Sequence, residues 1–140
     1  MKQTTKTENI LQERFGKDSL IALATTENGA PCVRNVNALY HDGAFFVLTY
    51  ALSAKMRQIE QNPVVAICGE WFSAQGVAFN LGWFCKAENK YIADKMKKAF
   101  SWINNGHNDF DDQNTCILKI KLTRGTLFYH GTRYDVDFEN

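Results

Sequence analysis

Four residues in the first half of the chain carry the side-chain chemistry that a phosphate group needs. They are Arg34 in the segment CVRNVNALY, and Thr49, Ser53 and Lys55 in the segment LTYALSAK. A guanidinium and an ammonium group supply charged hydrogen-bond donors, and the two hydroxyl groups supply neutral ones. Each residue alone is ordinary, but the four together predict an anion site if the fold gathers them.

Strand alternation places Arg34 among apolar residues. In a strand over 32–40, Cys32, Arg34 and Val36 share one face of the sheet. A guanidinium in such a position needs an anionic partner, because an unpaired buried charge is costly. Three interpretations stay open from this strand alone: an ion pair with an aspartate or glutamate, an edge strand that leaves Arg34 in water, or a bound anion.

A short helix is predicted from Ser53 to about residue 61. Ser53 is a suitable N-cap, and the free N–H groups of a first helical turn favour an anion. Lys55 in that turn is misplaced for the helix dipole, which favours cations at the other end. An anion between the helix start and Arg34 explains Lys55. The alternative is that Ser53 only caps the helix and that Lys55 is a solvated lysine.

The elements that must position these residues form an antiparallel β pattern. Asn28-Gly29 and Asp42-Gly43 predict hairpin turns, Gly76 and Gly82 predict bulges, and Arg124-Gly125 predicts the turn between two final strands. The predicted strands are 19–27, 32–40, 44–49, 64–72, 75–87 as a bent strand or hairpin, 115–123 and 125–131.

Two further helices complete the pattern. Thr5 with Glu8 predicts a capped helix that ends at Gly16, and helical spacing of apolar residues predicts a helix over 88–103 on the outside of a barrel. Six or seven short strands with two or three helices indicate a mainly β fold, an antiparallel barrel with peripheral helices. A single domain over residues 1–140 is expected.

Charge and composition exclude several classes of partner. The 16 basic and 15 acidic residues leave a net charge of +1, so no global field predicts binding to nucleic acid or to a membrane surface. The sequence has no apolar leader segment and no apolar run of spanning length. The four cysteines are widely separated, which predicts free thiols, no metal site and a cytoplasmic location.

The stretch ATTENGAPCVRNVNALYHDGAFFVLTYALSAKMRQIEQNPVVAIC resembles the pyridoxamine 5'-phosphate oxidase-like flavoproteins, and especially their short branch of general stress protein 26-like chains. The resemblance rests on a glycine-turn hairpin, an Arg-x-Val strand, a threonine near a strand end, Ser-x-Lys and Ile-x-x-Asn-Pro, in that order. It is densest over residues 19–71. It implies a split β-barrel homodimer that binds FMN at the subunit interface.

The same resemblance implies a role for each matching residue. Arg34 and Lys55 would grip the FMN phosphate, with Thr49 and Ser53 as neutral donors. Main-chain groups of the strand segment would lie along the flavin. The residues expected beside the flavin are Asn35, Val36, Asn37 and Leu48, with Asn37 near the ring edge.

The second subunit would complete the flavin pocket. Trp71 and Gln75 are the candidates for that contribution, and the alternative for both is a place in the core or at the rim of the site.

Three departures separate the chain from true vitamin B6 oxidases. Ala54 stands where those enzymes usually carry arginine, Leu39 stands where they usually carry lysine, and no counterpart of their C-terminal extension is expected after Asn140. The resemblance therefore implies an FMN-dependent oxidoreductase that acts on another small molecule. Two alternatives stay open: a non-catalytic protein that stores, carries or senses FMN, and a barrel that holds haem or a deazaflavin.

Overall fold

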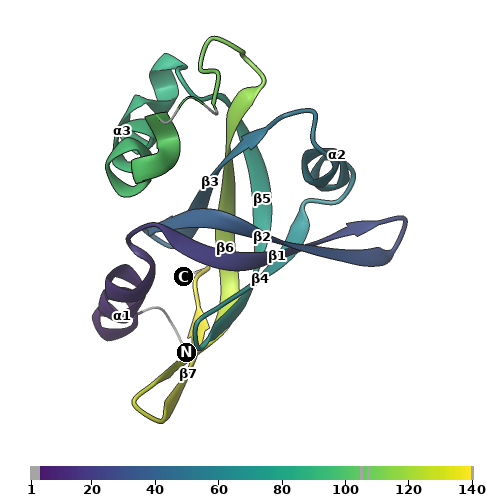
Figure 1. The fold of residues 1–140 in the computed structure, drawn as a ribbon. Helices are drawn as coiled ribbons and strands as arrows, with labels where there is room; N and C mark the ends of the chain where they lie inside the picture. The colour runs from purple at the N-terminus through teal and green to yellow at the C-terminus, as the bar shows by residue number, and fades with distance from the viewer. Residues whose placement is uncertain (1–3, 105, 107, 140) are drawn as a thin grey trace.

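The chain folds into a closed, six-stranded antiparallel barrel with helices packed around it (Figure 1). The computed structural model describes residues 4–139 except 105 and 107. The strands are β1 Ser19–Glu27, β2 Ala30–His41, β3 Ala44–Tyr50, β4 Val64–Gly69, β5 Phe72–Trp83, β6 Thr115–Tyr129 and β7 Thr132–Asp137. The helices are α1 Thr5–Phe15, α2 Ala54–Gln61 and α3 Lys90–Ala99, with short 3-10 helices η1 Ala87–Asn89 and η2 Ser101–Asn104. The predicted fold class is confirmed.

Strand β6 closes the barrel. The strand order is β3-β2-β1-β4-β5-β6-β7, and an additional pairing of β3 with β6 joins the two ends of the six-strand set. The β3 pairing uses residues 115–121 of β6, and the β7 pairing uses residues 124–129. One long strand therefore carries both the closure and the C-terminal hairpin.

The predicted turn at Arg124-Gly125 is wrong, because β6 runs straight through it. The chain reverses instead at His130-Gly131, where both residues have positive φ. Gly125 is required for close packing. A Cβ on Gly125 would lie 2.9 Å from the Phe72 ring and 2.9 Å from the Ser73 carbonyl oxygen. The missing side chain lets β5 and β6 approach here.

The predicted strand 64–72 is two strands. A tight turn at Glu70 and Trp71 separates β4 from β5, and Trp71 adopts a φ of 53° there. Tryptophan carries no turn signal, so the sequence pattern concealed the hairpin. The bent character predicted for residues 75–87 is confirmed by two shifts in the β5–β6 register, one between Gln75 and Gly76 and one before Trp83.

The helix ends differ by a few residues from the predicted ones. Thr4 is the N-cap of α1, one residue before the predicted Thr5, because Thr4 and Thr7 exchange hydrogen bonds between each side chain and the other's main-chain N–H. The end of α1 at Gly16 is confirmed. Helix α3 stops at Ala99, since Phe100 takes an extended conformation and is fully buried. No helix in the described residues is long and apolar enough to span a membrane.

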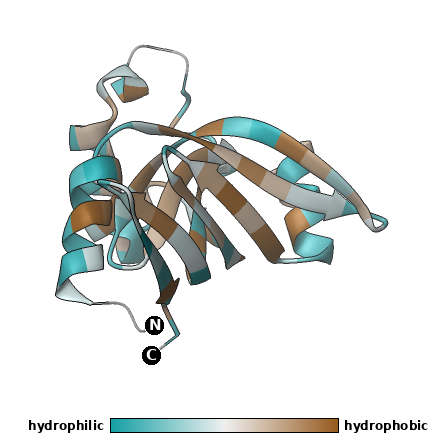
Figure 2. Ribbon diagram, turned by 90° about the horizontal axis from the view of Figure 1, so that it is seen from below, coloured by the Kyte–Doolittle hydropathy of each residue, from teal (hydrophilic) through white to brown (hydrophobic). Residues whose placement is uncertain are grey.

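Two apolar clusters hold the fold together. One fills the barrel interior, and the other lies outside it, where α3 packs on the outer surface of β3 and β6. Met96 on α3 and Ile117 on β6 are both fully buried in this outer cluster. Figure 2 shows apolar residues, in brown, along the strands, and many hydrophilic residues, in teal, in the helices. Helix α3 therefore lies outside the barrel, as predicted.

Candidate functional site: an anion clamp at the start of helix α2

Arg34 points inward from β2 toward β1 and α2. Its Nη1 donates hydrogen bonds to the Leu23 carbonyl oxygen at 3.2 Å and to Thr25 Oγ1 at 2.7 Å. Its Nη2 donates to Gln58 Oε1 at 2.8 Å. These partners come from β1 and α2. Together with β2, which carries Arg34, they fix the orientation of the guanidinium.

All of these partners are neutral. The salt bridges among the described residues join Arg57 to Glu27, Lys86 to Glu88, Lys90 to Asp94 and Arg133 to Asp135, and none includes Arg34. Within the described part of the chain, the ion-pair interpretation of Arg34 is therefore excluded. Arg34 is also half-buried, so its side chain does not extend into open water. The protein orients this cation and leaves its charge uncompensated.

Lys55 is the second cation of the site. Its Nζ donates to Thr49 Oγ1 at 2.6 Å and lies 3.5 Å from Ser53 Oγ. Burial lowers the pKa of Lys55, and the nearby positive charge of Arg34 lowers it further. Both causes act against the charged ammonium group. A bound anion would oppose both, because it would supply the negative charge that the site lacks.

Ser53 occupies the N-cap position but does not cap with its side chain. Its carbonyl oxygen accepts from Arg57 N at 3.1 Å, which begins the helix, but its hydroxyl makes no hydrogen bond to a first-turn N–H. The hydroxyl faces Lys55 instead. The prediction that Ser53 caps α2 is thus wrong in its side-chain part. Together, the structure brings Arg34, Thr49, Ser53 and Lys55 to one end of the barrel.

Two residues of this site escaped the sequence analysis. Thr25 is 1% exposed and Gln58 is 6% exposed, and their side chains hydrogen-bond to each other at 2.5 Å as well as to Arg34. Thr25 occupies the next inward-facing position of β1 after Leu23. A polar residue at an inward position that the pattern reserves for apolar residues was the sequence signal that could have identified it. Gln58 lies beside Ile59 on the buried face of α2, and only the tertiary structure shows its partner.

The segment predicted to lie along a flavin has one free main-chain edge. Residues 30–38 of β2 pair with β1, whereas in the described residues β3 pairs with β2 only over 39–41. The Val36 side chain is buried in the barrel, and the Asn35 side chain is exposed. Asn37 Nδ2 donates to Asp18 Oδ1 at 3.1 Å, which fixes its amide.

Two of the predicted contact residues lie away from the clamp. Leu48 points outward from β3 and packs on the outer cluster under α3, on the opposite face from Thr49. Trp71 sits on the β4–β5 turn with 68% of its surface exposed and meets the Phe128 ring edge-on. Within one chain, neither side chain faces Arg34 or Lys55.

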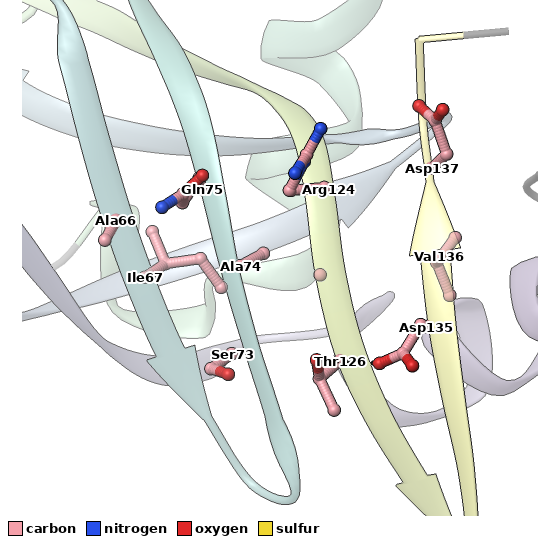
Figure 3. Close-up of a pocket in the computed structure, with 11 residues that line it drawn as sticks. Ala66, Ile67, Ser73, Ala74, Gln75, Arg124, Thr126, Asp135, Val136 and Asp137 are labelled. Carbon is pink, nitrogen blue, oxygen red and sulfur yellow. Dashed lines mark hydrogen bonds between the residues drawn. The ribbon is translucent and has the colours of Figure 1, made fainter. Parts of the chain in front are cut away.

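Gln75 lies on the outer surface of the barrel, in a cavity of about 650 Å³. It is the cross-strand partner of Arg124, and Figure 3 shows both side chains on neighbouring strands in this cavity. Asp135 is on the opposite wall, where hydrogen bonds from Arg133 and Thr126 hold its pKa below the usual value. Arg124 is a further polar group of this surface that the sequence analysis assigned to a turn.

The family model for pyridoxamine 5'-phosphate oxidase matches residues 7–129 of the chain. The chain therefore belongs to the pyridoxamine 5'-phosphate oxidase family. This match covers every strand of the barrel and the whole clamp. No curated protein matches the chain significantly in sequence.

Solved structures share the fold at low sequence identity. A NimC/NimA family protein from Clostridium acetobutylicum is 20% identical with a TM-score of 0.66, over 96% of this chain and 94% of that one. General Stress Protein 26 from Bacillus anthracis str. Sterne is 18% identical with a TM-score of 0.67, over 91% of this chain and 97% of that one.

Neighbours of this fold are named for different ligands. A FAD-binding protein from Mesorhizobium loti is 15% identical with a TM-score of 0.63, over 84% of this chain and 90% of that one. Other matching structures are a heme binding protein from Mycobacterium smegmatis and an F420 reductase. At these identities the likeness concerns the fold, and the ligand must be argued from the residues of this chain.

Proposed function

We propose that the chain binds FMN and that Arg34, Thr49, Ser53 and Lys55 hold its phosphate. One observation carries the proposal: two cations from different elements converge, and every partner they have in the described residues is neutral. A phosphate dianion would supply the missing negative charge and accept hydrogen bonds from both cations. The unfavourable environment of protonated Lys55 gives independent support.

The free edge of β2 supports the place of the flavin ring. Among the described residues, main-chain groups of Asn35, Val36 and Asn37 have no strand partner on that side, so they are available to a planar ligand with hydrogen-bonding edges. Asp18 already fixes the Asn37 amide before ligand binds. Contact of Asn37 with a ring edge would therefore cost little additional side-chain entropy. Leu48 faces away, and we leave it out of the proposed site.

We propose a homodimer with FMN at the interface. Leu20, Val33, Val64 and Phe79 are 62%, 70%, 60% and 46% exposed, and they lie on the outward face of four consecutive strands. An apolar surface of this kind is typical of a protein–protein contact. Gln75 lies on the same face of β5 as Phe79, so it is favoured over Trp71 as the contribution of the second subunit.

The proposed activity is that of a flavin-dependent oxidoreductase with a small-molecule substrate or electron donor. FMN would supply the electron- or hydride-transfer chemistry, and the residues of this chain would bind its phosphate and orient its ring. Burial raises the pKa of Cys116, the thiol that interacts with Lys55, so Cys116 does not supply a thiolate. We place the protein in the cytoplasm, as one domain over residues 1–140.

The absorption spectrum of the protein purified without added cofactor tests the ligand. A flavin spectrum, with FMN released on denaturation, is the expected result. A haem or deazaflavin spectrum would assign the barrel to another ligand, and a colourless protein that does not bind added FMN would refute the proposal. Oxidation of NADH or NADPH with an electron acceptor then separates an enzyme from a non-catalytic FMN-binding protein.

A further inference from the structure

We propose that a second anion site lies between α1, β2 and α3, and that it binds a small molecule carrying two linked phosphates. Helices α1 and α3 lie on the same flank of the barrel (Figure 1), and a cavity of about 430 Å³ separates them. This cavity shares no residue with the clamp at Arg34 and Lys55, so the inference does not depend on FMN.

Four basic residues from three elements line this cavity. Lys17 follows the end of α1, His41 ends β2, and Lys95 and Lys98 lie on α3, where Lys95 is half-buried and Lys98 is exposed. The remaining wall contains no carboxylate and is formed by Gln12, Gly16, Leu39, Tyr40 and Ala99. In a chain whose net charge is +1, this is a local concentration of positive charge.

Two neighbouring carboxylates are engaged elsewhere. Asp18 accepts hydrogen bonds from Asn37 Nδ2 and from Trp102 Nε1 at 3.0 Å, and Asp94 forms an ion pair with Lys90. None of the three lysines in the cavity takes part in a salt bridge among the described residues. Three ammonium groups around one cavity repel each other. A bound anion would make the net electrostatic energy of the cavity favourable.

Buried anchors fix the positions of the three elements. The Tyr40 hydroxyl donates to Glu8 Oε2 at 2.7 Å, which ties α1 to β2, and it accepts from Gly43 N at 3.1 Å. Met96 fixes α3 to the barrel through the outer cluster. Lys95 Nζ lies 5.0 Å from the centre of the Tyr91 ring, and this contact holds it at one side of the hollow. Lys95 and Lys98 are thus presented by a helix that is anchored to the barrel.

The number and spread of the cations favour a diphosphate over a single phosphate. Two or three charged donors satisfy one phosphate, whereas four basic groups around 430 Å³ can contact two linked phosphates.

Calorimetric titration of the full chain with inorganic pyrophosphate at low salt tests this site. We expect saturable binding that persists in the Arg34→Ala, Lys55→Ala double variant, where the clamp is removed. In that background, Lys95→Gln with Lys98→Gln should weaken pyrophosphate binding about tenfold or more.

Lys97→Gln is the matched control. Lys97 is on the same helix but lies 5.8 Å from the Phe84 ring and outside the cavity, so its loss should change the affinity less than twofold. Absence of saturable binding in the clamp-free variant, or an equal loss in the Lys97→Gln control, would overturn the second site. Failure of FMN to bind would affect only the clamp.

Discussion

Gln58 Oε1 accepts a hydrogen bond from Arg34 Nη2 at 2.8 Å, and it also accepts from the Thr25 hydroxyl. A neutral amide thus orients the guanidinium, although the carboxylate of a glutamate would have nearly the same shape at this position. A carboxylate would satisfy the arginine internally. The amide leaves the positive charge available to a ligand.

Gln58→Glu should therefore weaken FMN binding without unfolding the protein. The new carboxylate would neutralise Arg34 and repel the phosphate, so we expect a loss of about ten- to a hundredfold, or roughly 1.4 to 3 kcal/mol. Fluorescence titration of FMN measures this, and urea denaturation of the ligand-free protein checks the fold. Gln61→Glu, an exposed position at the end of the same helix, is the control. Equal affinities in both variants would contradict this role of Gln58.

Arg34→Ala should weaken FMN binding by about 1.5 to 3 kcal/mol, the usual contribution of a hydrogen bond to a charged group, which is about ten- to over a hundredfold in Kd. Arg57→Ala is a matched control, because Arg57 lies on α2 and its charge is paired with Glu27 at the surface. We expect the control to bind FMN as the unchanged chain does. An Arg34→Ala protein with unaltered affinity would remove the clamp from the proposal.

FMN affinity should fall at alkaline pH because of Lys55. Its pKa is lowered in the ligand-free protein, and a bound phosphate would raise it again. Below the lowered pKa, Lys55 is protonated with or without ligand, and its contribution to affinity does not change. Above that pKa, binding must take up a proton, so affinity decreases as pH rises toward about 10.4, the usual lysine value.

Lys55→Arg separates this effect from the titration of other groups. Arginine stays protonated throughout this range, so the variant should lose the alkaline decrease that starts at the lowered pKa of Lys55. Kd for FMN measured at about pH 7 to 10 in both proteins gives the comparison. The same alkaline decrease in the two proteins would assign the effect to a group other than Lys55.

Val33→Asp should convert the proposed dimer into monomers. Val33 is 70% exposed on β2, at one side of the apolar sheet face, and a charge there would lose its hydration in the interface. Size-exclusion chromatography with light scattering measures the mass, and FMN affinity should fall with it. Tyr91→Asp, on the exposed side of α3, should stay dimeric. A monomeric unchanged chain that binds FMN tightly would contradict interface binding.

Local signals in the sequence were sufficient for much of the barrel. Asn28-Gly29 and Asp42-Gly43 both adopt positive φ, and they produce the β1–β2–β3 meander where the sequence predicts it. The β4–β5 hairpin was missed because its turn uses Trp71, a residue without turn preference. Gly125 was misleading because the sequence does not distinguish a glycine that allows close strand packing from a glycine that allows a turn.

The sequence indicated the four residues of the clamp but not the side chains that orient Arg34. Arg34 and Lys55 carry charges that are visible in the sequence, and Thr49 and Ser53 were predicted beside them as neutral donors. Their proximity depends on the barrel that joins β2 to α2. Thr25 and Gln58 are common polar residues that acquire a role through distances set by that barrel. The outward position of Leu48 follows from the alternation of β3, with Thr49 on the inward face.

The long strand β6 also sets the order in which the chain can fold during synthesis. Ala44 of β3 pairs with Lys121 of β6, so residues near the start of the chain wait for a partner made much later. The β1–β3 meander can form early from local turns, but its β3 edge stays open until β6 has left the ribosome. Barrel closure is thus one of the last steps of biosynthesis. A nascent chain halted before β6 presents an unprotected strand edge to other chains and to chaperones.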